Sequence, residues 1–97
     1  MVQLEVGQRI DRDELMRGFV GMQYTRNDVA FARGTFRVRG DTVEIIPVYE
    51  ELAIRVEFFG DEIDAMYHFD VLENKKLKDV SKFTLYATSQ FIVGADR

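Results

Sequence analysis

The side chains best suited to binding chemistry are the arginines of the segment RGTFRVRG, residues 33–40. A planar guanidinium binds carboxylates or phosphates through two parallel hydrogen bonds. Because successive side chains of a strand point to opposite faces, Arg37 and Arg39 would share one face and Val38 would lie on the other. The segment therefore predicts a pair of outward arginines that recognise either an acidic protein surface or a nucleic acid.

The position of the aromatic residue distinguishes these two ligands. A sheet that binds RNA presents aromatic rings outward, where bases stack on them, whereas here the alternation turns Phe36 inward with Val38. The formal net charge of −4 also argues against general nucleic-acid binding, although the net charge is +2 over residues 1–40 and −6 over residues 41–97. We therefore expect the arginines to contact a partner protein, with direct nucleic-acid binding and a purely structural face as the alternatives.

Side chains that could perform catalysis are few. His68 is the single histidine, and Ser81 and Ser89 stand outside any catalytic motif. Glu57 and Asp64 could form an acid–base pair, but two charges on an exposed sheet account for them as well. The chain has no cysteine for a zinc site and no phosphate-binding glycine loop. The sequence thus predicts a non-catalytic chain without a cofactor or metal site.

Length and composition predict one domain over residues 1–97. The chain has 97 residues, of which 46% are hydrophobic, enough for one core. It contains no run of 18 apolar residues and no cysteine, so we expect a cytoplasmic protein without membrane contact. We also expect the chain to be a monomer.

The residues that would position the arginines begin with a helix. Asp11 is a favourable N-cap, and Glu14 three residues later completes a capping box. The apolar stripe of this helix would consist of Leu15, Phe19 and Met22. Asn27 could cap a second, short helical turn over residues 29–33, ended by Gly34.

From residue 35 onward the pattern alternates as strands do. Gly40-Asp41 and Gly60-Asp61 are each typical of a two-residue hairpin loop. The first loop would place Arg37 opposite Glu44, and the second would place Glu57 opposite Asp64. Two more strands follow, and residues 88–97 would dock through Phe91 and Val93. The expected fold class is α+β, an antiparallel sheet built from hairpins with the N-terminal helix, and the short second one, packed on one face.

Three segments carry a family resemblance. They are GMQYTRNDVAFARGTFRVRGDTVEIIP, IRVEFFGDEID and FTLYA. Together they resemble the second domain of the UvrB family of bacterial nucleotide excision repair, over residues 6–93. A related module of transcription-repair coupling factors matches the arginine-rich hairpin less strictly and is the alternative family.

This resemblance implies a docking domain that binds UvrA and so loads UvrB on damaged DNA, within the excision nuclease system and the SOS response. It implies no catalysis by this chain, since the ATPase motifs of the family are absent from it. The partner-binding residues that it implies are Arg26, Arg37, Arg39, Arg55, Glu57 and Phe58. Alternation, by contrast, turns Phe58 inward and Phe59 outward.

Overall fold

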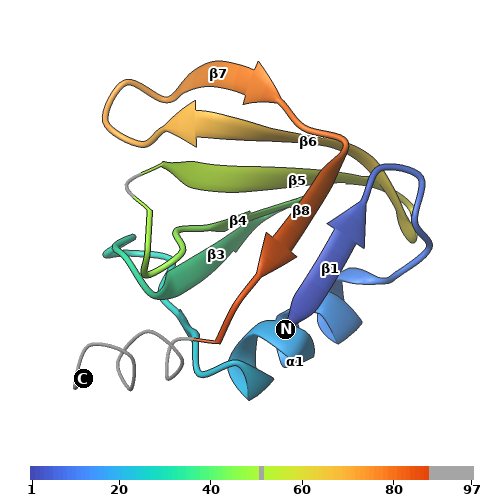
Figure 1. Cartoon of the computed structure of the whole chain (residues 1–97), viewed down its shortest axis with the longest axis horizontal. Coiled ribbons are helices and arrows are strands. Elements are labelled where there is room, and N and C mark those ends of the chain that lie inside the picture. The colour runs from blue at the N-terminus through green and yellow to red at the C-terminus, as the bar shows by residue number, and fades with distance from the viewer. Residues whose placement is uncertain (51, 88–97) are drawn as a thin grey trace.

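The computed structural model describes residues 1–50 and 52–87, and within them the chain is an α+β structure (Figure 1). The elements in chain order are β1 Val2–Glu5, α1 Arg12–Gly21, β2 Thr25–Arg26, β3 Thr35–Arg39, β4 Thr42–Ile45, β5 Ala53–Phe59, β6 Glu62–Asp70, β7 Lys75–Asp79 and β8 Lys82–Leu85. Strands β2 to β7 form one sheet in sequence order, antiparallel except for the parallel pair β2–β3. Strands β1 and β8 pair separately. The expected fold class is confirmed.

The helix starts where its capping signals place it. The Asp11 side chain accepts a hydrogen bond from the Glu14 backbone N–H at 2.7 Å, which satisfies one of the free donors of the first turn. Leu15 and Phe19 are buried, and the Phe19 ring packs against Phe36 of β3 at 5.3 Å between centroids. The helix is therefore fixed to the sheet through its apolar stripe.

The second helical turn predicted for residues 29–33 is wrong. The Asn27 side chain does cap the backbone, because its Oδ1 accepts from the N–H groups of Val29 and Ala30. These bonds close an Asx turn rather than begin a helix, and Thr35 Oγ1 then donates to the Ala32 carbonyl just before β3. Local side-chain bonds thus take the backbone groups that a helix would have used.

Both glycine-aspartate loops form hairpins. Gly40 and Gly60 adopt φ values of +58° and +66°, which suit the first position of a loop that matches the twist of its strands. The first hairpin has the predicted register, with Arg37 opposite Glu44. The turn and the alternation therefore fixed this part of the sheet locally.

The register predicted for the second hairpin is wrong beyond its first two pairs. A β-bulge lies between the pairs of Phe58 and Glu57, with Asp64 of β6 as the extra residue, so that Glu57 faces Ala65 rather than Asp64. The extra residue relieves the like-charge pair that the regular register would have created. It also turns Met66 into the core and Tyr67 to the opposite face, whereas alternation from the turn would have turned Tyr67 inward.

Apolar side chains form two clusters, one on each side of the six-stranded sheet. The main cluster joins α1, the β1–β8 pair and the inward residues of β3 to β6. A smaller cluster on the opposite side consists of Ile46, Ala53, Tyr67 and Phe69, with Phe31 and Val71 partly buried against it. The sheet is thus covered by the helix on one side and leaves the other side to polar side chains and this small cluster.

The β1–β8 pair was not predicted. Leu4 and Leu85 of these strands are buried in the main core, at 2% and 0% exposure. Only one apolar alternation, Val2 and Leu4, signalled β1, and its partner lies eighty residues further along the chain. Phe91 and Val93, predicted to dock the tail, lie outside the described residues.

Candidate protein-docking site

Polar side chains gather on the sheet face that α1 leaves open, which we call the arginine face. Its members are Arg37 and Arg39 of β3, Glu44 of β4, Arg55 and Glu57 of β5, and Tyr67 of β6. Cross-strand pairing aligns Arg37 with Glu44 and Glu44 with Arg55 in one row across three strands. Four of the six predicted partner-binding residues, all except Arg26 and Phe58, lie on this face.

Glu44 lies at the centre of the arginine face and is only 2% exposed. Its Oε1 accepts a hydrogen bond from Arg37 Nε, and its Oε2 accepts one from Arg55 Nε. A buried carboxylate would be strongly unfavourable alone, but here both oxygens have cationic partners. The result is a three-residue ion network built from three adjacent strands.

Arg55 bonds to other residues of the protein through each of its guanidinium nitrogens. Its Nη1 donates to the Tyr67 hydroxyl at 3.1 Å and its Nη2 donates to Asn74 Oδ1 at 2.6 Å, while its plane lies 4.3 Å from the centre of the Phe69 ring. Burial alone would lower the pKa of Arg55, but the hydrogen bond with Tyr67 and the charge of Glu44 outweigh it and raise the pKa. Arg55 therefore remains charged and is held by neighbours on every nitrogen.

Glu57 joins the same network through Tyr67. The Tyr67 hydroxyl donates to Glu57 Oε2 at 2.7 Å. Burial raises the pKa of Tyr67, and the adjacent Glu57 carboxylate raises it further, because both disfavour a phenolate at this position. Tyr67 thus acts as a neutral donor that links Arg55 to Glu57.

Arg37 and Arg39 keep donors for a ligand. The Arg37 guanidinium lies 4.2 Å from the centre of the Phe31 ring, and only its Nε has a hydrogen-bond partner among the described residues. Arg39 is exposed and forms no hydrogen bond or ion pair within the described part of the chain. Both arginines line a hollow of about 430 Å³ that also includes Thr42 and Val71. An anion could therefore bind here without displacing any existing ion pair.

Arg26 lies apart from the arginine face. It pairs in parallel with Phe36, whose side chain points to α1, and it lines a groove of about 640 Å³ with Met16 and Val20 of the helix. Its Nε donates to Asp28 Oδ2 at 3.1 Å, and this bond lowers the pKa of the Asp28 carboxyl. The charge of Arg37 lowers the pKa of Asp28 further, so Asp28 links Arg26 to the edge of the arginine face.

Phe58 points away from the arginine face, as alternation predicted. Its side chain belongs to the main core at 6% exposure, whereas Phe59 is 80% exposed. A role for Phe58 in partner binding remains a prediction, and its burial gives it the position of a support beneath the face.

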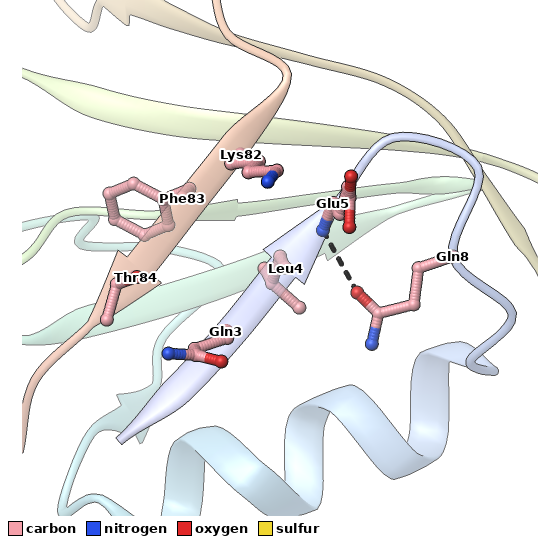
Figure 2. A pocket seen from close by; sticks show the side chains of 7 residues that line it. All are labelled: Gln3, Leu4, Glu5, Gln8, Lys82, Phe83 and Thr84. Atoms are coloured by element: carbon pink, nitrogen blue, oxygen red, sulfur yellow. Dashed lines mark hydrogen bonds between the residues drawn. The ribbon is translucent and has the colours of Figure 1, made fainter.

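Three further hollows among the described residues are lined by none of the predicted partner-binding residues. Figure 2 shows one of about 410 Å³ over β1 and β8, where the Glu5 N–H donates to Gln8 Oε1. No group of three or more potential metal ligands occurs among residues 1–50 and 52–87. In the same residues, no helix has the length and apolarity needed to cross a membrane.

Residue-level reading missed the groups that hold the arginines in place. Phe31, Phe69 and Asn74 were not singled out, and Tyr67 was expected on the inner face. Among the residues at the centre of the arginine face, only Glu44 could be placed from the sequence, because the first hairpin sets it opposite Arg37. Tyr67 and Phe69 depend on the bulge in β6, which the local pattern does not show, and Asn74 depends on how the turn before β7 folds back onto Arg55.

Comparison with known proteins places the chain in a family. A family model described as the UvrB interaction domain matches residues 2–91. The chain belongs to the UvrB interaction domain family. It is 63% identical over 95 residues to the UvrABC system protein B of Campylobacter fetus and 56% identical over 97 residues to that of Bifidobacterium longum. These matches cover 97% and 100% of the chain but only 14% of each relative, so this UvrB interaction domain corresponds to a small part of those proteins.

Proposed function

We propose that this UvrB interaction domain docks its parent protein onto UvrA during bacterial nucleotide excision repair, using the arginine face. The proposal rests on Arg37 and Arg39, which lie on the same face of β3 and have free hydrogen-bond donors. The other members of the arginine face already have hydrogen-bond partners within the protein. The family name and the UvrABC naming of the relatives support a partner within that system. The domain itself contributes binding and no catalysis.

Charge-assisted hydrogen bonds would form between these arginines and carboxylates of UvrA. Arg37 is held in orientation by Glu44 and Phe31, while Arg39 is free to adjust at the rim. Such contacts favour specificity and fast association more than raw affinity, and their strength falls as salt screens them. We therefore expect the affinity for UvrA to decrease as the ionic strength rises.

Charge reversal at Arg39 tests the proposal most cleanly. Arg39→Glu should leave the far-UV spectrum and melting temperature unchanged, because this side chain has no partner among the described residues. It should weaken binding to purified UvrA in titration calorimetry by at least about tenfold, since like charges would then face each other. Arg37→Glu is less suitable, because it would place a second carboxylate against buried Glu44.

Lys82→Glu is the matched control. Lys82 is exposed on β8, which packs on the helix side of the sheet, and the substitution changes the charge by the same amount. It should retain the parent affinity for UvrA. Equal affinities of the parent and Arg39→Glu for UvrA would overturn the assigned face.

A gel-shift titration of DNA with the same proteins distinguishes docking to UvrA from direct nucleic-acid binding. A domain that binds DNA through its arginines would shift DNA at low salt with a steep salt dependence, and Arg39→Glu would reduce that slope. We expect no shift by the domain alone.

A further inference from the structure

Glu44 poses a question that the docking proposal leaves open. The surface proposed to receive carboxylates has a carboxylate at its centre, and that group cancels part of the positive charge of the face. If binding depended on charge alone, Glu44 would weaken it. A buried acid at this position therefore needs a role other than adding to the electrostatic attraction.

The geometry around Arg37 indicates that role. Glu44 holds Arg37 only through Nε, at the inner edge of the guanidinium, while Phe31 lies 4.2 Å from the same group. One bond and one ring contact fix both the position and the plane of the guanidinium. The Nη1 and Nη2 groups, the two nitrogens that form a bidentate pair with a carboxylate, have no hydrogen-bond partner among the described residues, and 14% of the Arg37 side chain is exposed.

Arg55 holds Glu44 from the side opposite Arg37. It binds the second oxygen of Glu44 and is itself held by Tyr67 and Asn74. With all three of its nitrogens bound to neighbours, Arg55 fixes the second oxygen of Glu44 and has few donors left for a partner protein. It therefore acts on docking through Glu44.

We propose that Glu44 is a positioning residue for the docking surface. It holds Arg37 by Nε so that its terminal nitrogens stay available to a partner, and Arg55 holds Glu44 in place from the other side. This inference rests on the proposed function, namely docking to UvrA through the arginine face. It assigns the contact role to Arg37 and Arg39 and a supporting role to Arg55, which family resemblance had placed among the contacts.

Neutralising Glu44 separates positioning from charge. Glu44→Gln removes a negative charge from a surface that binds an acidic partner, so a purely electrostatic role predicts tighter binding to UvrA. Positioning predicts weaker binding, by about tenfold, because a glutamine has only one acceptor oxygen, cannot accept from both arginines, and no longer holds Arg37 by a charge-assisted bond. Glu73→Gln is the matched control: it removes the same charge from an exposed turn near the face, and it should bind at least as tightly as the parent.

A double-mutant cycle shows whether Glu44 acts through Arg37. Arg37→Lys keeps the charge but lacks the planar fork, and it should itself weaken binding by about tenfold. In that background Glu44→Gln should cause no further loss, because the group that it orients is already gone. A structural role without positioning would give the same additional loss in both backgrounds.

Phe31→Leu covers the case in which Glu44→Gln does not fold. It removes the ring beneath Arg37 without changing any charge, and it should weaken binding about threefold in the parent and not at all in Arg37→Lys. The Nε–H signal of Arg37 in nitrogen-15 spectra provides a readout without partner: it should be protected in the parent and exchange rapidly in the Glu44 or Phe31 variant.

The outcomes distinguish the two proposals. If the parent fails to bind UvrA, the proposed function is overturned and this inference with it. If Arg39→Glu weakens binding as expected but Glu44→Gln binds as tightly as the parent or more tightly, the docking face stands and the positioning role is overturned.

Discussion

Phe58 and Phe59 are consecutive in β5 but lie on opposite faces of the sheet. Phe58 is 6% exposed within the main core, and Phe59 is 80% exposed on the side of Arg55 and Glu57. Alternation along an unbroken strand produces this difference, because the bulge of this hairpin inserts its extra residue into β6. Two adjacent phenylalanines thus have different energetic roles.

Truncation of these two residues should have unequal effects on stability. Phe58→Ala removes a large side chain from a packed core and should lower the free energy of unfolding by about 3–5 kcal/mol. Phe59→Ala removes a ring that is already in water and should change it by less than about 0.5 kcal/mol. Urea denaturation of both variants measures the difference, and comparable losses would contradict the burial described here.

Alanine at two glycines should shift stability in opposite directions. Gly60 has φ of +66°, where a Cβ is strained, so Gly60→Ala should destabilise the protein by about 1 kcal/mol. Gly21 ends α1 with no atom within 4 Å of an added Cβ, so Gly21→Ala should stabilise it by about 0.5–1 kcal/mol. Thermal unfolding of the two variants tests this, and a stabilising Gly60→Ala would show that the loop geometry is different.

Stability should fall at high pH because of Tyr49. Its hydroxyl donates to the Thr84 carbonyl, and burial raises its pKa from 10.0 to about 12. Between these values the unfolded chain loses the proton while the folded chain keeps it, so unfolding becomes more favourable as the pH rises. The contribution is fully present below pH 10 and is lost as the pH passes through about 12.

Unfolding measured in urea from pH 9 to pH 12 reports this loss. Tyr49→Phe should be less stable at neutral pH, because the Thr84 carbonyl loses its donor, yet its stability should fall less steeply above pH 10. Burial also raises the pKa values of Tyr24 and Tyr67, so these two residues still make stability decrease with rising pH in this variant. A slope identical to that of the parent would contradict the assignment to Tyr49.

The second hairpin shows where local pattern is insufficient. After the loop, β6 offers Ala65 and Met66 in succession, and either can follow Ile63 into the core. The regular register would bury Ala65 and place Asp64 opposite Glu57. The observed register buries Met66, which removes more apolar surface from water, and separates the two carboxylates. This choice is made by packing against the helix and the neighbouring strands.

The sequence by itself determined the features that depend on a few neighbouring residues. The cap at Asp11, the loop at Gly40 and the inward position of Phe36 follow from short-range hydrogen bonding, backbone preference and alternation. Together they turn Arg37 and Arg39 outward. Alternation also puts Arg55 and Glu57 on one face of their own strand, and family resemblance added Arg26 and Phe58 as further contacts.

Only the tertiary structure decided how the arginines are held. Glu44 meets Arg55 because β4 pairs with β5, and the connection between these strands contains no two-residue loop that fixes their register. Tyr67 reaches Arg55 because of the bulge, and Arg26 is turned toward the helix by its parallel pairing with β3. These strands follow one another along the chain, but no local pattern fixes the register of these pairs, so it follows from the burial of the whole core rather than from any one segment.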